Sequence, residues 1–289
     1  MTRAAFDRFL NGQAGAEVPL VPMFEDLASR VGSLGAEDMI ADAGAWSSNL
    51  AKTGKLLSAD ALVLGFGAGA ASYRDAVKGG ASALETAGVT TALDAFDRLV
   101  KTEQSFTGCI ASITGPMTLG AEVPDAADLK HSLVEIAEAF CKTRPDLLLF
   151  REGNALGGQD VSMAERKAYN TIKNMASYYS VPLGIYLEDY VPSMIPSLAK
   201  LKVPYIFLGA DKAGNLPDLS LLRDLAAEVD GIGVPINFTD AQAARQQAQD
   251  ACNTLKGANI LFTHSGELGR EIDLEATLEL IKDLREMGS

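Results

Sequence analysis

The sequence predicts an α/β protein built as a (β/α)8 barrel, also called a TIM barrel, on three observations. Eight short apolar runs follow one another along the chain, and each precedes turn residues and a segment with helical periodicity. The runs are apolar throughout, as expected for parallel strands that are covered on both faces. The chain has 289 residues, 47% of them hydrophobic, and barrels of roughly 250 residues commonly form one domain. We therefore predict a single barrel domain over residues 1–289.

Eight residue ranges are predicted as the strands of the barrel, in chain order. They span residues 18–24, 61–65, 106–113, 147–150, 182–187, 204–208, 232–238 and 259–262. Between the third and fourth runs, Leu129, Leu133, Ile136 and Phe140 recur at spacings of four, three and four, which predicts a helix that packs outside the sheet. The alternative architecture is an open, doubly wound sheet.

The charge and the composition limit the classes of molecule that the protein is expected to bind. A formal net charge of −13 without a basic patch disfavours binding to nucleic acid or to an anionic membrane surface. The first twelve residues lack the apolar run of a signal peptide, and no long uncharged segment could span a bilayer. Cys109, Cys141 and Cys252 form no Cys-x-x-Cys pair and are expected to be reduced thiols. We predict a soluble, cytoplasmic protein that binds a small-molecule substrate.

The loops that follow the strands of a barrel meet on one face, so residues just past each strand should form one acidic site. The candidates are Glu25, Ser112, Thr114, Arg151, Glu152, Glu188, Asp189, Asp211, Asn237 and His264.

Glu188, Glu152 and His264 are the predicted catalytic residues. Crowded carboxyl groups raise one another's pKa, so Glu188 or Glu152 could act as a general acid, and a histidine titrates near neutral pH. The remaining candidates are predicted to bind substrate. Their structural alternative is a role in hydrogen bonds and ion pairs within the loops, with Arg151 neutralising one or two carboxylates.

A divalent metal could be held by carboxylate and imidazole ligands. Glu152, Glu188, Asp189 and His264 are the set to test, although we expect no tightly bound metal. His131, the other histidine, lies in a predicted helix among charged residues and should be exposed.

Gly65, Gly67 and Gly69 follow the second strand, and glycines of this kind can approach a phosphate closely. The spacing lacks the final glycine of a G-x-G-x-x-G motif. We therefore interpret the segment as a flexible active-site loop.

Several segments resemble the uroporphyrinogen decarboxylase superfamily, which includes decarboxylases and the cobalamin- and coenzyme M-linked methyltransferases. They are RFLNGQ followed by VPLVPMF, SITGPMTLGAE at 112–122, LGIYLEDYVPSMIPSLAKLKVPYIFLGAD at 183–211, and the closing NILFTHSGELGREIDLEATLELIKDL. The resemblance spans most of the chain. It implies a barrel enzyme of one-carbon metabolism whose cofactor or partner is a corrinoid, a corrinoid protein or tetrahydrofolate.

The chain departs from both branches of this family. Where the zinc methyltransferases have a His-x-Cys pair and a later Cys, this sequence has Leu187, Glu188 and Asp189 and then Thr263 and His264. The soft thiolate ligands are thus absent. It also lacks the arginine-rich first loop and the aspartate after the second strand of the decarboxylases, so uroporphyrinogen is an unsuitable substrate.

The leading functional hypothesis is an enzyme that transfers or removes a one-carbon unit, namely a methyltransferase linked to a corrinoid or folate. The first alternative is a decarboxylase or related lyase acting on a small carboxylate, with an acid such as Glu188 protonating the carbanion. The second is a non-catalytic small-molecule-binding barrel.

Overall fold

A computed structural model describes residues 3–13, 15, 17–67, 73–74, 83–124, 129–153 and 160–287. Its strands are β1 (Leu20–Val21), β2 (Ala61–Leu64), β3 (Gly108–Thr114), β4 (Leu147–Glu152), β5 (Leu183–Leu187), β6 (Tyr205–Leu208), β7 (Gly231–Ile236) and β8 (Ile260–His264). They form one parallel sheet in the order β1-β8-β7-β6-β5-β4-β3-β2. The eight predicted runs are therefore the eight strands.

The edge strands β1 and β2 bring the barrel close to closure. The Asp60 backbone amide donates to the Leu20 carbonyl at 2.8 Å, and the Leu20 amide donates to the buried Asp60 carboxylate at 2.8 Å. Strand β1 is shorter than the predicted run 18–24 because Pro19 and Pro22 flank it, and proline has no amide hydrogen to donate to a ladder.

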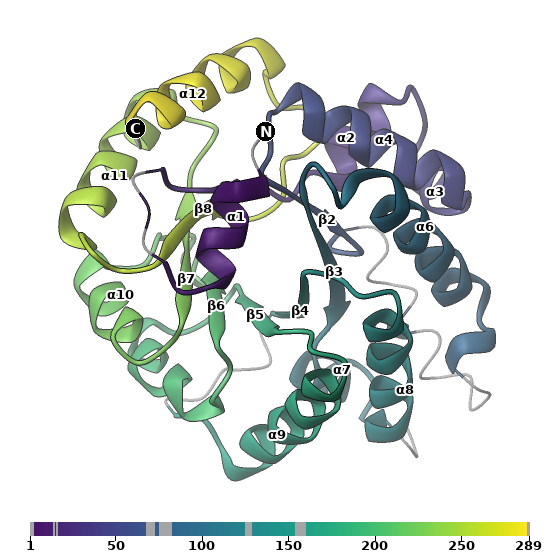
Figure 1. Cartoon of the computed structure of the whole chain (residues 1–289). Coiled ribbons are helices and arrows are strands. Elements are labelled where there is room, and N and C mark those ends of the chain that lie inside the picture. Colours follow the sequence, from purple (N-terminus) through teal and green to yellow (C-terminus); the bar gives the residue numbers. More distant parts are fainter. Residues whose placement is uncertain are drawn as a thin grey trace.

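Helices surround the strands (Figure 1). They are α1 (Arg3–Leu10), α2 (Glu25–Val31), α3 (Ala36–Ile40), α4 (Ala43–Leu56), α6 (Ala87–Glu103), α7 (Pro116–Glu122), α8 (Leu129–Lys142), α9 (Met163–Tyr178), α10 (Leu219–Ala226), α11 (Ala241–Thr254) and α12 (Leu274–Met287). Two 3-10 helices, η1 (Ala83–Glu85) and η2 (Pro192–Leu201), complete the described elements. The β5–β6 connection is the 3-10 helix η2, which contains Pro192 and Pro196, and proline disfavours a regular α-helix in its interior.

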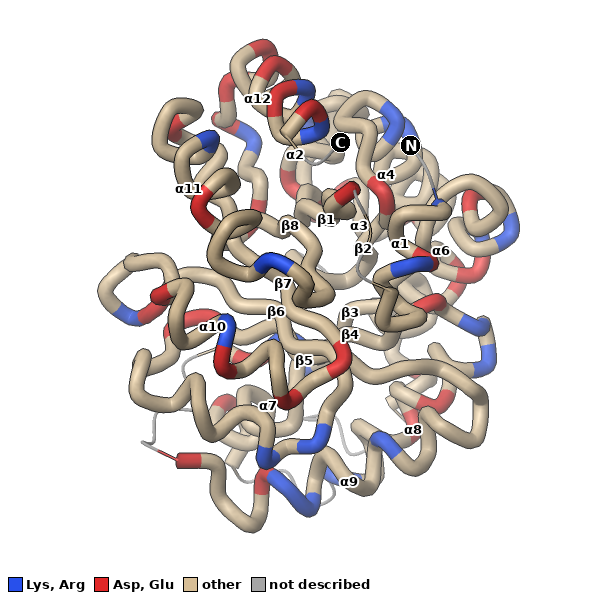
Figure 2. Tube along the Cα trace, turned by 60° about the vertical axis from the view of Figure 1, so that its left-hand side comes forward, with Lys and Arg blue, Asp and Glu red and all other residues tan. Residues whose placement is uncertain are grey.

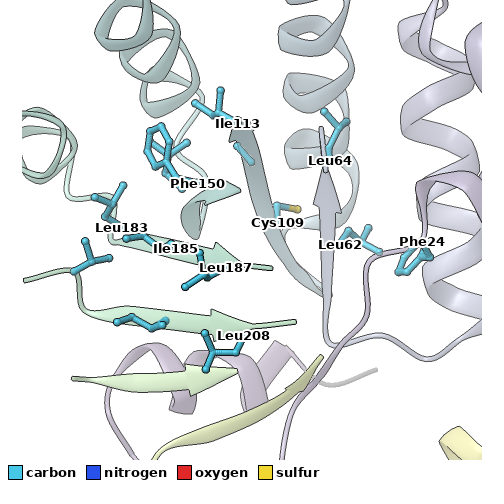
Figure 3. Packing of buried hydrophobic residues seen from close by; sticks show 14 of the residues in the cluster. Phe24, Leu62, Leu64, Cys109, Ile113, Phe150, Leu183, Ile185, Leu187 and Leu208 are labelled. Atoms are coloured by element: carbon cyan, nitrogen blue, oxygen red, sulfur yellow. The ribbon is translucent and has the colours of Figure 1, made fainter. Parts of the chain in front are cut away.

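Side chains on alternate strand positions form two apolar layers. One lies between the strands and the surrounding helices, and Figure 3 shows part of it, with Leu62 and Leu64 on β2 and Phe150 on β4. The other fills the barrel interior and includes Ile110, Leu149 and Tyr186. This parity decides which polar residues at the strand ends face the interior.

Helix α1 covers the amino-terminal end of the barrel, opposite the expected site. Phe6 and Phe9 belong to the interior layer, and a methyl group at Gly108, the first residue of β3, would overlap the Phe6 ring. The Arg3 guanidinium pairs with Asp146 at 2.7 Å. This end of the barrel is therefore closed by packing, which leaves the carboxyl end for a site.

Acidic and basic residues are interspersed on the outer helices, for example on α12 (Figure 2). Within the described part of the chain, no helix is both long enough and apolar enough to cross a bilayer.

Candidate functional site

Arg151, near the end of β4, is a cation at the carboxyl end of the strands, which we call the barrel mouth. It shares the inward-facing parity of Leu147 and Leu149. Its Nε and Nη2 atoms lie 2.8 and 2.6 Å from Oε1 of Glu188, and its Nη1 donates to the Phe66 carbonyl at 2.6 Å. The guanidinium also lies over the Phe66 ring, 4.6 Å from its centroid. Two strand ends and one loop thus hold this cation.

Glu188 follows β5 directly and accepts both bonds through one oxygen. Among the described residues, Oε2 of Glu188 has no hydrogen-bond partner. The side chain is 17% exposed, against 30% for Arg151. The structure therefore brings together two predicted site residues, Arg151 and Glu188, at a position that solvent reaches.

Glu25, the first residue of α2, is fully buried, and both of its carboxylate oxygens accept hydrogen bonds. Oε1 accepts from Trp46 Nε1 at 2.9 Å and from the Gly65 amide at 2.6 Å, while Oε2 accepts from the Gly67 amide at 2.7 Å. Burial raises the pKa of Glu25, and the three hydrogen bonds and the charge of Arg151 oppose that rise. Glu25 therefore holds the loop after β2 and does not offer a free oxygen to a substrate.

The glycine segment after β2 thus binds an internal carboxylate. Gly65 has a φ of +90°, and a β-carbon there would lie 2.5 Å from the Ser112 carbonyl oxygen, so both its conformation and its surroundings require glycine. Gly69, the third glycine of the pattern, lies outside the described residues. The expected flexibility of the full loop remains a prediction.

Glu267, in the loop after β8, is a site residue that the sequence reasoning missed. Its Oε1 accepts from the Asp26 amide at 2.9 Å, and a methyl group at Gly67 would overlap its carboxylate. Burial raises its pKa to about 7, and the negative charge of Glu25 contributes to the rise. The side chain remains partly exposed.

Glu152 ends β4 on the opposite parity from Arg151, and its carboxylate faces the surrounding helices. It accepts from the Met117 amide at 3.1 Å, and from the amide and hydroxyl of Thr118 at 2.8 and 2.6 Å. Tyr169 of α9 donates a further hydrogen bond. These donors belong to α7 and α9, so Glu152 caps the amino terminus of α7. This position separates Glu152 from the interior that Arg151 and Glu188 face, contrary to our expectation of one shared pocket.

His264 ends β8 and shares the outward parity of Ile260 and Phe262. Its Nδ1 accepts from the Gly266 amide at 2.9 Å, and its ring lies 5.3 Å from that of Phe238. Burial lowers its pKa to about 4, so the imidazole is neutral at neutral pH. Its Nε2 is buried and has no hydrogen-bond partner among the described residues.

Two predicted binding residues, Asp211 and Asn237, accept hydrogen bonds within their own loops, and a third, Asp189, is exposed. Asp211 accepts from the Ala213 and Asn215 amides, each at 2.8 Å. Asn237 accepts from the amide and the hydroxyl of Thr239. Asp189 is exposed and adopts a left-handed φ of 53°. Of the three, Asp189 is the one whose side chain extends into solvent.

Ser112 and Thr114 lie on β3 with the inward parity of Ile110. Thr114 pairs in register with Arg151. The buried Ser112 hydroxyl has no hydrogen-bond partner among the described residues, so it is available to a polar atom of a ligand or to water.

The donor set does not fit a zinc ion of the kind that the resemblance implies. In the part of the chain that the structure describes, no three His, Cys, Asp or Glu side chains are grouped so as to hold a metal. Cys109 is in β3, Cys141 in α8 and Cys252 in α11, and none of them lies at a strand end near His264.

Comparison with known proteins supports the fold. No family model and no curated protein sequence matches the chain. Similar solved structures include a methyltransferase from Methanosarcina mazei, with a TM-score of 0.76 and 10% identity, covering 99% of this chain and 98% of that one. A putative vitamin-B12-independent methionine synthase from Listeria monocytogenes has a TM-score of 0.57 and 11% identity, covering 93% and 96%. At these identities the similarity establishes the (β/α)8 barrel fold.

Proposed function

We propose that the chain is an enzyme that transfers a one-carbon unit, specifically a methyltransferase whose methyl donor is a corrinoid or a folate. The observation that carries this proposal is the Arg151–Glu188 pair at the carboxyl end of a barrel that superposes over its full length on a methyltransferase. Active sites of such barrels lie at this end. In this proposal the methyl donor is a second substrate, free or carried on a corrinoid protein.

Arg151 supplies the binding function in this proposal. Its guanidinium is fixed by Phe66 and Glu188 and remains 30% exposed, which suits it to hold an anionic group of a substrate by charge-assisted hydrogen bonds. Glu188 orients that cation and keeps Oε2 for the substrate. We retain Glu188 as the first candidate catalytic residue and assign Glu152 a structural role.

His264 is proposed as a neutral hydrogen-bond donor outside the interior that Arg151 and Glu188 face, because its ring lies on the outward side of β8, as Glu152 does on β4. Because the Gly266 amide donates to Nδ1, the ring proton resides on Nε2. The Nε2–H group has no acceptor among the described residues, and a buried donor of this kind is stabilised when a ligand supplies an acceptor.

A decarboxylase or related lyase acting on a small carboxylate is the second candidate. The exposed guanidinium of Arg151 favours it, because arginine binds carboxylates with two parallel bonds. Both candidates use the same site and differ in the product.

The test is an assay of the purified chain with methylcobalamin or 5-methyltetrahydrofolate and a panel of thiol and amine acceptors. We expect the carrier to lose its methyl group and the acceptor to gain 14 mass units, about the mass of one CH2 group, and the Arg151→Ala variant to lose the activity. Arg98→Ala, on the exposed face of α6, is the matched control. Release of carbon dioxide from small carboxylic acids without demethylation would favour the lyase, and saturable binding without turnover would favour a binding protein.

A further inference from the structure

Two carboxyl groups, those of Glu25 and Glu267, meet at the backbone of Gly67. Glu25 accepts the Gly67 amide hydrogen at 2.7 Å, and the Glu267 carboxylate lies so close to the Gly67 α-carbon that a methyl group there would overlap it. Glu25 begins α2, and Glu267 accepts from the Asp26 amide in the same turn. Two acidic side chains from opposite ends of the sequence therefore lie against the same glycine, Gly67.

Their hydrogen bonds distinguish the two acids. Glu25 accepts three N–H donors, from Trp46, Gly65 and Gly67, and is fully buried. A proton on Glu25 would compete with these donors for its oxygens. Glu267 accepts one N–H, and its Oε2 has no hydrogen-bond partner among the described residues. A proton held by the pair is therefore better placed on Glu267.

The loop that carries Glu267 is fixed on both sides. The Leu268 amide donates to the Met23 carbonyl at 2.7 Å, and the Leu27 amide donates to the Leu268 carbonyl at 3.2 Å. On the other side, the Ser265 carbonyl accepts from the Ala210 amide at 2.9 Å. Glu267 is thus held in place, as a group that transfers a proton must be.

Three charged groups act on Glu267. Glu25 opposes its ionisation, Arg151 favours it, and Asp26 favours it through its amide and opposes it through its charge. Together with burial, these groups bring the pKa of Glu267 to about 7. A carboxyl group with this pKa can give or take a proton at neutral pH.

We propose that Glu267 is the catalytic residue that exchanges a proton with the substrate, while Glu25 holds the loop of Gly65 and Gly67 next to Glu267. This inference rests on the proposed function. In methyl transfer to an acceptor X–H, the X–H proton passes to the Glu267 carboxylate. The electron pair left on X forms the bond to the methyl carbon, and the carrier keeps the pair of the bond that breaks. The proton then leaves Glu267, for solvent when a corrinoid carries the methyl group and for the freed carrier nitrogen when a folate does.

The first test needs no substrate. The chain labelled with 13C at the glutamate side-chain carboxyl carbons is titrated by NMR from pH 4 to 9, beside Glu267→Gln and the surface variant Glu279→Gln. We expect a glutamate midpoint near 7 in the wild type that is lost in Glu267→Gln and retained in Glu279→Gln. Arg151→Gln should raise that midpoint, because it removes the cation that favours the carboxylate.

The outcomes separate this inference from the proposed function. If the midpoint near 7 persists in Glu267→Gln, or if every glutamate titrates below about 5, as unperturbed carboxyls do, the inference is overturned whether or not methyl transfer occurs. If the titration is found but no carrier loses its methyl group, only the proposed function fails. With turnover established, Glu267→Gln should lower kcat by roughly 100-fold or more and remove the inflection near pH 7. Unchanged kcat and an unchanged pH profile would also overturn the inference.

Discussion

Arg151 and Glu188, at the ends of the neighbouring strands β4 and β5, form an ion pair with Nη2 and Oε1 2.6 Å apart. The same guanidinium lies on the Phe66 ring, so the loop after β2 and the carboxyl ends of β4 and β5 meet at one cation. The pair is partly exposed, and pairs of this kind contribute about 1 kcal/mol or less to stability. We therefore expect the pair to matter more for substrate binding than for folding.

Replacing Arg151 by Lys should separate binding from stability. Lysine keeps the charge but cannot donate to Phe66 and Glu188 together in the planar arrangement seen here. We expect KM to rise about tenfold or more and the thermal midpoint to change by less than about 4 °C. Steady-state kinetics and a thermal melt of the same preparation check this, and an unchanged KM would show that Arg151 does not contact the substrate.

Glu152→Ala should destabilise the protein strongly. The change leaves the Met117 and Thr118 amides and the Tyr169 hydroxyl without their buried acceptor. We expect a loss of about 2–4 kcal/mol in the free energy of unfolding. Urea unfolding measures it, with Glu279→Ala on the exposed face of α12 as control. Equal midpoints for both variants would refute the capping role.

His264 should make the protein sensitive to mild acid. The unfolded chain takes up a proton below about pH 6.5, but burial delays protonation of folded His264 until about pH 4. Stability should therefore fall as the pH drops from 6.5 to 4, by about 3 kcal/mol at most. The His264→Gln variant should lack this part of the slope in urea unfolding at several pH values. If the free energy of unfolding changed equally with pH in both proteins, a group other than His264 would cause the acid sensitivity.

Glu267 should make the free energy of unfolding change with pH in the opposite direction. Its folded pKa of about 7 lies above the unfolded value of about 4.5, so the carboxylate costs stability as the pH rises from 4.5 to 7. Glu267→Gln should thus be more stable than the wild type at pH 8, by up to about 3 kcal/mol, and equal to it at pH 4. Lower stability of the variant at pH 8 would contradict the raised pKa.

The sequence was sufficient to predict the barrel but not which way its strand residues face. Runs such as 147–150 are apolar on both faces, because one face meets helices and the other the interior. Nothing in such a run reveals its inward parity. Glu152 was therefore grouped with Glu188, although its neighbour Arg151 is the residue that faces the mouth.

Glu267 was missed for a different reason. It lies three residues beyond β8, and its position depends on contacts of its loop with Met23 and Asp26, more than 240 residues earlier in the chain. Local sequence carries no mark of such a contact. The one available signal was the glycine at position 67, since only a residue without a side chain leaves room for the Glu267 carboxylate.

Turnover by Glu188→Gln, beside the matched Glu279→Gln control, tests the central claim that the Arg151–Glu188 pair is the catalytic centre. The amide keeps the shape of the side chain and removes the charge that orients Arg151. In the methyl-transfer assay we predict a loss of kcat/KM of about 100-fold or more, with a thermal midpoint within about 4 °C of the wild type. A Glu188→Gln enzyme with wild-type kcat/KM would contradict the account and leave this carboxylate as a structural contact of the loop.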